Sequence, residues 1–266
     1  MQAYGGVSIV NALPSWYGSS LAINLKVDVN IKEGKRDLTR ENTLISTIIN
    51  YFKERYSIPD ITVDIKSEIP QKSGLKSSSA VSVALIHEIV KRYGIKDVSP
   101  PKFSAILSLK AGVSYTGALD DAVASYCGGV SFTNNKYFQI IKTEDPPSDL
   151  VILLLARGGR QKEVNINKLK KYKHVFEEIF RISIKDIILG MKINGILIAN
   201  ILDYPIDPIE TALKNGALAS GISGNGPSYF AVCKEGEEGK VYESLKKFGD
   251  VIITKPVNLD CKDLPI

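Results

Sequence analysis

The 266-residue chain contains little histidine, cysteine or methionine, with two, three and two residues of these types. His87 and His174 lie in separate segments, so a histidine-based metal centre or a Ser-His-Asp triad has few residues to draw on. Cys127, Cys233 and Cys261 are widely spaced and include no C-x-x-C pair. We therefore expect neither a disulfide framework nor a structural zinc site, and we interpret all three as buried or incidental thiols.

Long hydrophobic runs are also missing. No apolar stretch approaches the roughly 20 residues that a membrane helix requires, and the first residues lack the basic start and apolar core of a signal peptide. We therefore expect a cytoplasmic protein without a membrane partner. The G-x-x-x-x-G-K-[ST] pattern of P-loop NTPases does not occur either. What is present, 44% hydrophobic and 24% charged residues, is typical of a globular chain of one large domain or two lobes.

The most informative stretch is residues 70–84, which read PQKSGLKSSSAVSVA. It lies between an alternating segment, residues 61–66, that predicts a strand, and an amphipathic segment that predicts a helix ending near Arg92. Gly74 permits a tight turn, and serine hydroxyls at a helix start can bond free N–H groups. Such a start directs N–H donors and the positive end of the helix dipole at one point, which favours a phosphate. A nucleotide, a sugar phosphate and an RNA backbone all fit.

A second candidate is the Asp120–Asp121 pair, which enters a predicted helix that is otherwise small and apolar. One aspartate in the first turn of a helix is a frequent capping choice. A second one beside it, on a segment that we expect to be buried, needs a partner such as a lysine, Mg²⁺ or a substrate hydroxyl. We therefore interpret the pair as a general base or a metal ligand.

Two loops complete the set of candidates. Arg157 and Arg160 follow residues 150–155, a continuous apolar run that predicts a buried strand. The arginines are suited to clamp a carboxylate or a phosphate, although exposed arginines in a glycine loop are more often solvated. Residues 217–228 contain three glycines and lead into a predicted strand. These glycines allow a close backbone approach to a ligand, or simply a tight turn.

The remaining pattern predicts an α+β fold in two lobes that share one cleft. Strands at 5–10 and 21–29 should pair antiparallel, and Asn134-Asn135 should be the turn of a hairpin between 129–133 and 136–142. Helices are expected at 40–56, at 100–112, and at 167–201 with a break near 181–183. A short helix, whose entry is bracketed by Pro205 and Pro208, should extend to Lys214, followed by a helix at 240–248 and a last strand at 251–255. The irregular segment 143–148 predicts the boundary, which gives an N-terminal lobe over 1–145 and a C-terminal lobe over 146–266.

These motifs together resemble those of the GHMP superfamily of small-molecule kinases. Residues 70–79 are similar to its P-x-x-x-G-L-G-S-S-A motif, and the form with Lys76 in place of glycine is like that of archaeal-type shikimate kinases. Residues 221–228 resemble the third, glycine-rich motif. The first motif matches loosely, because Gly6 stands where mevalonate kinases carry a lysine, and Asn11-Ala-Leu replaces their Gly-Glu-His. The resemblance extends over the whole chain in order and spacing.

The resemblance implies a two-lobed GHMP-kinase-like fold with the active-site cleft between the lobes. It implies phosphoryl transfer from ATP, with Mg²⁺, to the 3-hydroxyl of shikimate, a step toward chorismate and the aromatic amino acids. Asp120 falls where mevalonate kinases place their aspartate, so we expect it to be the base, with Asp121 its neighbour in metal or substrate binding. Residues 100–119 contain no glutamate to match the acidic metal ligand of mevalonate kinases, and Asp121 is expected to substitute.

The expected site residues fall into three groups. The nucleotide is assigned to Lys72, Ser73, Gly74, Leu75, Lys76, Ser77, Ser78, Ser79, Gly224 and Gly226. The metal is assigned to Ser78 and Asp121. Shikimate is a carboxylate and needs a cation, for which Arg157, Arg160 and Lys72 are candidates. Asn11 is also assigned to the binding of shikimate.

Two alternatives stay open from the sequence. The same scaffold could phosphorylate homoserine or mevalonate, since the fold does not fix the acceptor. From another class, the net charge of +5 and a first lobe resembling domains of ribosomal and translation proteins fit an RNA-binding module. That module needs aromatic and basic residues interleaved on one face, which the sequence does not show. We therefore expect no nucleic-acid partner, and the oligomeric state is not predicted.

Overall fold

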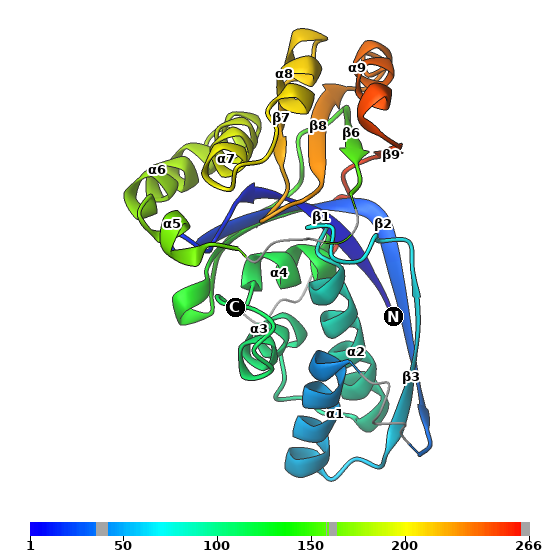
Figure 1. The fold of residues 1–266 in the computed structure, drawn as a ribbon. Coiled ribbons are helices and arrows are strands. Elements are labelled where there is room, and N and C mark those ends of the chain that lie inside the picture. Colours follow the sequence, from blue (N-terminus) through cyan, green and yellow to red (C-terminus); the bar gives the residue numbers. More distant parts are fainter. Residues whose placement is uncertain (36–41, 158, 160–163, 262–266) are drawn as a thin grey trace.

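The structure is a computed structural model that describes residues 1–35, 42–157, 159 and 164–261. In this part of the chain, five strands form one antiparallel sheet and four strands form a second (Figure 1). The strands of the first sheet are β1 (Gln2–Val10), β2 (Tyr17–Glu33), β3 (Ile61–Ser67), β4 (Val130–Asn134) and β5 (Gln139–Glu144). Those of the second are β6 (Leu150–Leu155), β7 (Ala219–Ile222), β8 (Tyr229–Lys234) and β9 (Val251–Thr254). The predicted α+β architecture is confirmed.

Strand β2 is the spine of the first sheet. It is 17 residues long and pairs antiparallel with β1 along one edge and with β4 and then β3 along the other. The predicted pairing of the first two strands is therefore confirmed. Val27, Val29 and Ile31 are buried and alternate with more exposed polar residues, as expected for a strand with one solvated face.

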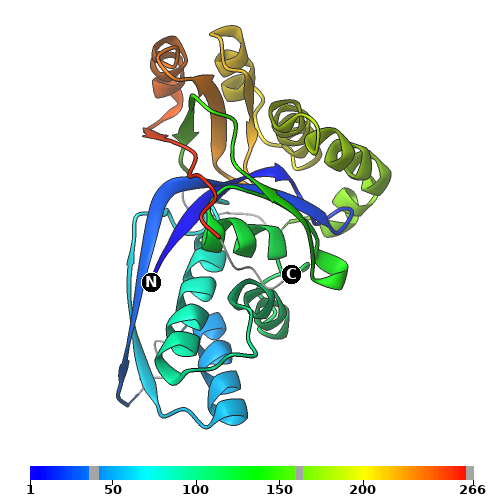
Figure 2. The same ribbon diagram turned by 180° about the vertical axis from the view of Figure 1, so that it is seen from behind.

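Helices cover both faces of the first sheet around the start of β2. On one side lie α1 (Thr43–Tyr56), α2 (Ser77–Tyr93), α3 (Pro100–Lys110) and α4 (Leu119–Cys127). Of these, α2 and α4 contact β1 and β2 directly. On the other side α6 (Lys173–Ser183) also contacts both strands, and α7 (Ile187–Ile201) contacts β1 (Figure 2). Because helices lie on both faces, residues 18–23 of β2 are all buried.

Helices also pack on the second sheet. The remaining helical elements of the described chain are η1 (Asn135–Tyr137), α5 (Ile166–Lys170), α8 (Asp207–Lys214), α9 (Gly239–Leu245) and η2 (Lys246–Phe248). Val151 and Leu153 of β6 pack with residues of α8 and α9, while Ile152 and Leu154 join the main core. This two-sided burial explains the continuous apolar run of β6. No helix in the described residues is both long enough and apolar enough to pass through a bilayer.

The chain returns to the first sheet after β9, which corrects the interpretation of the cysteines. Pro256 forms a β-bridge with Ile23, and the Val257 carbonyl accepts a hydrogen bond from the Gly129 N–H at 2.8 Å. This path brings Cys261 to Cys127 at the end of α4, and the two form a disulfide. The expectation of free thiols is therefore wrong for this pair, because local patterns do not reveal contacts between residues 134 positions apart.

The third cysteine behaves as expected. Cys233, in β8, is a buried free thiol. Burial raises the pKa of its thiol to about 11, so it is protonated at neutral pH.

Two glycines bring α7 into direct contact with β7. A Cβ on Gly195 would lie 2.6 Å from the Gly221 Cα, and a Cβ on Gly221 would lie 2.2 Å from the Gly195 Cα. Neither position has room for a larger side chain. This contact fixes the strand that leads into the glycine-rich turn.

We expect Gly195→Ala to lower the free energy of unfolding by about 1–3 kcal/mol, because the added methyl group would overlap the β7 backbone. Gly239→Ala is the matched control, since no atom lies within 4 Å of a Cβ there. Its free energy of unfolding should change by less than about 0.5 kcal/mol. Urea denaturation followed by circular dichroism measures both variants. Equal stability of the two would contradict the close contact of helix and strand.

Candidate active site

Segments from both halves of the chain enclose a cleft of about 610 Å³. Its wall includes residues 72–79, the Asp120–Asp121 pair, Asn11 from the β1–β2 loop, and Gly224 and Asn225 from the β7–β8 turn. The two candidate motifs of the sequence therefore meet at one cavity. A volume of this size is typical of small-molecule sites.

Helix α2 begins at this cleft without a side-chain cap. Lys76 occupies the N-cap position in the left-handed conformation, with a φ of 69°, and makes no side-chain capping hydrogen bond. The expected capping by serine hydroxyls is not found; Ser77, Ser78 and Ser79 instead line the cleft. The N–H groups of the first turn point out of the helix start, where the positive end of the helix dipole also lies. This end of α2 is therefore suited to hold phosphate oxygens.

The β7–β8 turn supports the segment that leads into α2. We call this segment, together with the first three residues of α2, the phosphate loop (residues 70–79). Gly74 has a φ of 84°, and a Cβ there would lie 2.5 Å from the Ser223 carbonyl oxygen. Ser223 Oγ donates to the Gly74 carbonyl at 3.0 Å, and the Ser228 N–H donates to the Ser73 carbonyl at 3.1 Å. Gly226 is not in the cleft wall: a Cβ there would meet the Tyr204 ring. Of the two predicted glycines, only Gly224 lines the cleft.

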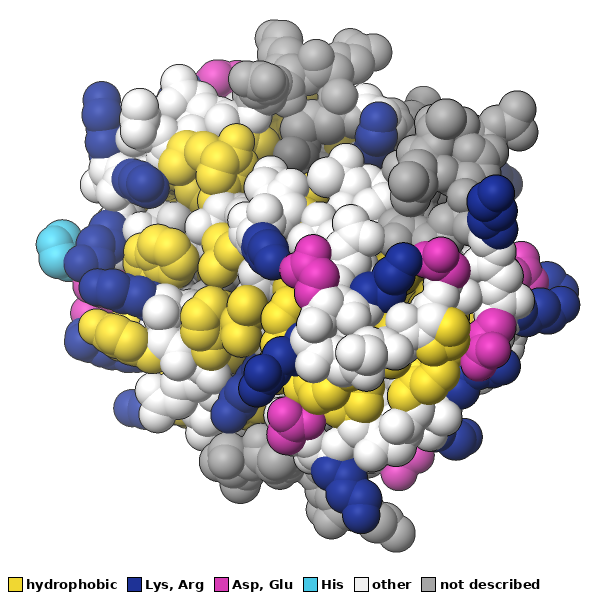
Figure 3. Space-filling model, turned by 90° about the horizontal axis from the view of Figure 1, so that it is seen from below, with side chains coloured by type: hydrophobic (Ala, Val, Ile, Leu, Met, Phe, Trp, Pro, Cys, Tyr) yellow, Lys and Arg dark blue, Asp and Glu magenta, His cyan; other side chains and the backbone are white. Residues whose placement is uncertain are grey.

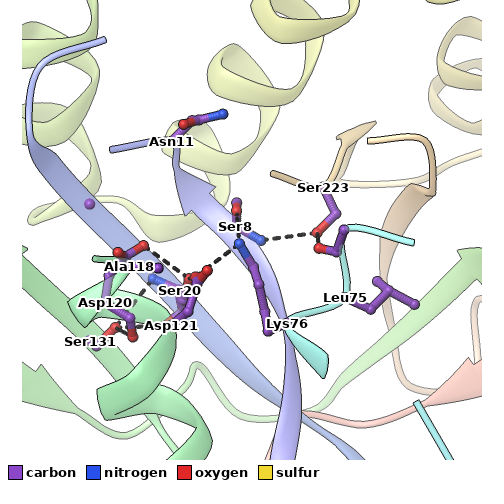
Figure 4. Close-up of polar contacts among 12 residues, drawn as sticks. Ser8, Asn11, Ser20, Leu75, Lys76, Ala118, Asp120, Asp121, Ser131 and Ser223 are labelled. Atoms are coloured by element: carbon purple, nitrogen blue, oxygen red, sulfur yellow. Dashed lines mark hydrogen bonds and ion pairs between the residues drawn. The ribbon is translucent and has the colours of Figure 1, made fainter. Parts of the chain in front are cut away.

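Polar contacts hold the aspartate pair in the first turn of α4 (Figure 4). Asn135 Nδ2 donates to Asp120 Oδ1 at 2.9 Å. Ser20 Oγ lies 2.5 Å from Asp121 Oδ1 and 3.3 Å from Asp120 Oδ2, so its hydroxyl favours the nearer oxygen. Lys76 Nζ lies 2.9 Å from Asp121 Oδ1. The second carboxylate was expected to need a partner, and the structure supplies a lysine.

The surroundings of Asp120 favour its neutral form. The residue is 3% exposed. Burial and the charge of Asp121 raise the pKa of Asp120 from its ordinary 3.8 to about 7, although Lys76 and the hydrogen bond from Asn135 act in the opposite direction. A carboxyl group with this pKa exchanges protons near neutral pH, which is the property of a general base.

The candidates for acceptor binding are placed differently from one another. Asn11 lines the cleft, and its Nδ2 donates to Asn225 Oδ1 at 2.7 Å. Arg157 is exposed and does not line the cleft; its guanidinium lies 5.5 Å from the centre of the Tyr229 ring. Arg160 lies outside the described residues. Lys72, on the phosphate loop, lines the cleft.

Three polar residues of the site were not predicted. Ser8 and Ser20 are register partners across β1 and β2, which places both near the acidic pair. The antiparallel pairing was predicted, and the exact register would have located them. Asn135 lies, as predicted, in the turn of a hairpin, because it begins η1 between the antiparallel strands β4 and β5. Its hydrogen bond to Asp120 was not predicted, because a turn residue gives no local sign of a contact with the site.

The donors available for a metal are few. The described residues contain no group of three or more His, Cys, Asp or Glu side chains that could hold a metal ion. Mg²⁺, however, usually keeps several waters and uses one or two carboxylates together with substrate phosphates. The Asp121 carboxylate and the Ser78 hydroxyl, which both line the cleft, are oxygen donors of the kind this ion takes.

Comparison with known proteins identifies the family. Residues 43–129 match the family model described as GHMP kinases N terminal domain, and residues 206–251 match that described as GHMP kinases C terminal. The shikimate kinase of Pyrococcus furiosus is 34% identical over 269 residues, covering 93% of this chain and 95% of that protein. The chain belongs to the GHMP kinase family. The resemblance inferred from the three motifs is therefore confirmed.

Other GHMP kinases agree with this assignment. The shikimate kinase of Methanothrix thermoacetophila is 31% identical, with 96% of this chain and 92% of that protein covered. Among solved structures, the mevalonate kinase of Methanococcus jannaschii superposes with a TM-score of 0.71 at 18% identity, covering 97% of this chain and 98% of that one. A homoserine kinase from Cytophaga hutchinsonii gives 0.67 at 19% identity, covering 98% and 95%. The structural matches establish the GHMP kinase fold.

The raised pKa of Asp120 predicts a pH-dependent stability. Between about pH 4 and pH 7 the folded protein holds a proton on Asp120 that the unfolded chain has lost, so this group lowers stability as the pH rises. In Asp120→Asn the loss is absent, and the variant should gain stability relative to the parent across this range. Urea denaturation at intervals from pH 4 to pH 8 measures the difference. A difference that does not change with pH would contradict the raised pKa.

Proposed function

We propose that this GHMP kinase transfers the γ-phosphoryl group of ATP to the 3-hydroxyl of shikimate and releases ADP and shikimate 3-phosphate. The reaction is a step toward chorismate and the aromatic amino acids. The observation that carries the chemistry is the meeting of the phosphate loop and the aspartate pair in one cleft. The acceptor is supported by relatives named shikimate kinase that align over nearly the whole chain.

The phosphate loop is the proposed nucleotide site. The N–H groups at the start of α2 would receive the phosphate oxygens, and Gly224 approaches from the other half of the chain. Lys72 is exposed at the cleft and has no ion-pair partner among the described residues, so it is available to a phosphate or to the acceptor carboxylate. Phosphoryl transfer asks the protein mainly for such positioning and charge.

Asp120 is the proposed base. It lines the cleft and is fixed by Asn135, so its orientation does not depend on a bound substrate. In the reaction it would take the proton of the acceptor hydroxyl while the hydroxyl oxygen bonds to the γ-phosphorus and the bond to the ADP oxygen breaks. Asp121 forms an ion pair with Lys76 and is proposed to support the site electrostatically.

Magnesium is proposed to be held by Ser78 and Asp121 together with the nucleotide. The described partners of Asp121, Lys76 and Ser20, both contact Oδ1, so the other carboxylate oxygen is the one assigned to the metal. When bound, Mg²⁺ would neutralise charge on the phosphate oxygens.

The acceptor site and the lobe boundary are further parts of the proposal. Asn11 is proposed to bind the acceptor, which is supported by its position in the cleft wall. Lys72, an exposed lysine of the same wall, is proposed to meet the acceptor carboxylate, while Arg157 is turned toward Tyr229. The first sheet uses strands up to residue 144 and the second begins at residue 150, which supports lobes of 1–145 and 146–266. A cytoplasmic location stays a prediction.

The alternatives receive less support. The solved mevalonate and homoserine kinases share the fold at under 20% identity, which does not identify an acceptor. An RNA-binding module is not favoured by membership of a kinase family. On the face shown in Figure 3, basic side chains alternate with acidic and apolar ones and do not form a continuous basic surface.

A coupled ADP-release assay with shikimate, homoserine and mevalonate tests the function. We expect turnover with shikimate and at most a few per cent of that rate with the other two. Asp120→Asn should lose at least about 100-fold in kcat, because the base is gone, while ATP still binds. Turnover of another acceptor in preference to shikimate would refute the substrate, and full activity of Asp120→Asn would refute the base.

Ser78→Ala tests the phosphate and metal site separately. Loss of the hydroxyl should raise the KM for Mg·ATP by about 10-fold, the effect of one charge-assisted hydrogen bond. Ser114→Ala, which removes another hydroxyl from the cleft wall outside the phosphate loop, is the matched control and should leave that KM unchanged. Initial rates at varied Mg·ATP measure both. Identical constants for the two variants would remove Ser78 from the site.

A further inference from the structure

Lys76 has a buried ammonium group with fixed partners. Its side chain is 8% exposed, and Nζ lies 2.9 Å from Asp121 Oδ1 and donates to Ser8 Oγ at 2.6 Å (Figure 4). The two partners come from α4 and β1. Gly224, from the second half of the chain, approaches the same group: a Cβ there would lie 3.4 Å from Nζ. Three separate segments therefore surround this one charge.

The backbone around Lys76 is arranged to allow this. A Cβ on Gly6 would lie 3.2 Å from Lys76 Cγ and 3.0 Å from the Leu21 carbonyl oxygen, so glycine in β1 leaves room for the lysine stem. Lys76 itself has a φ of 69°, a conformation that favours glycine. A lysine at a position better suited to glycine, with a buried ionic end, indicates that its side chain has a specific task.

We propose that Lys76 is a positioning residue that holds the aspartate pair in register with the phosphate loop. The inference rests on the proposed function. The Lys76 backbone begins α2, where the phosphates are proposed to bind, and its ammonium fixes Asp121, the neighbour of the proposed base. One residue thus sets the distance between the nucleotide and the aspartate pair, which is proposed to take the proton of the acceptor hydroxyl. Phosphoryl transfer is sensitive to such alignment.

The proposal differs measurably from a direct grip on the nucleotide. If Lys76 bound phosphate equally in the ground and transition states, its loss would raise the KM for ATP and leave kcat unchanged. If it aligns the aspartates, its loss lowers kcat and leaves ATP binding nearly intact. We expect Lys76→Met to lower kcat by about 100-fold, with the KM for ATP changed by less than about threefold.

Three further variants make the test specific. Lys76→Arg keeps a cation and should recover at least about 10-fold of the lost kcat. Lys76→Gly suits the left-handed backbone but lacks the ammonium, and its kcat should be as low as that of Lys76→Met. Lys72→Met is the matched control, because this lysine is on the same loop with a φ of 53°, lines the same cleft and has no ion-pair partner among the described residues. Lys72→Met should raise the KM for ATP or the KM for the acceptor, and should not lower kcat.

Removal of Lys76 leaves the half-buried Asp121 carboxylate without its cation, which is expected to destabilise the fold. Ser8→Ala avoids this problem because it keeps the ion pair and removes one hydrogen bond from the ammonium. It should lower kcat by about 3- to 10-fold, the worth of a single hydrogen bond, without changing ATP affinity. Nucleotide titration verifies ATP affinity in every variant.

The outcomes separate the two levels of the proposal. No ADP release by the parent enzyme with shikimate would reject the proposed function, whatever the variants do. An active parent with kcat unchanged in Lys76→Gly and Ser8→Ala would reject the positioning role alone. A raised KM for ATP with kcat unchanged in Lys76→Met would also reject it, and would assign the ammonium to the nucleotide.

Discussion

The contact between the phosphate loop and the β7–β8 turn is the constraint on which the site depends. Gly74 packs against the Ser223 carbonyl so closely that no side chain fits between them. Ser223 Oγ also accepts a hydrogen bond from the Ser8 N–H at 3.3 Å, so this serine connects β1, the phosphate loop and the second sheet. The cleft is therefore a joint product of both halves of the chain. Neither half contains its wall alone.

The electrostatics follow from the same arrangement. Helices α2 and α4 both begin at the cleft, after Lys76 and Ala118 in left-handed conformations, so two positive dipole ends face it. These ends and the Lys76 ammonium act on two adjacent carboxylates. Asp121 lies against the cation, while burial keeps Asp120 near the point where it can accept a proton at neutral pH. Similar side chains thus acquire different properties from their surroundings.

Local patterns predicted most elements and the two motifs of the site. The alternation of β3, the apolar run of β6 and the turn before α2 each have a local physical cause, and each was found where expected. The register of the strands and the path of the chain after β9 could not be predicted from local patterns. Ser8 and Ser20 lie opposite each other because β1 and β2 pair with bulges, and the hydrogen bond from Asn135 to Asp120 depends on how η1 packs. The family resemblance supplied the chemistry that periodicity alone left open.

The disulfide between Cys127 and Cys261 has a topological consequence. All four strands of the second sheet lie between these two residues, so the whole sheet is enclosed in a covalent ring anchored at the end of α4. A ring of 134 residues restricts the unfolded chain by about 5 kcal/mol in the chain-entropy estimate. A single break in the backbone anywhere along this ring would leave the two fragments joined.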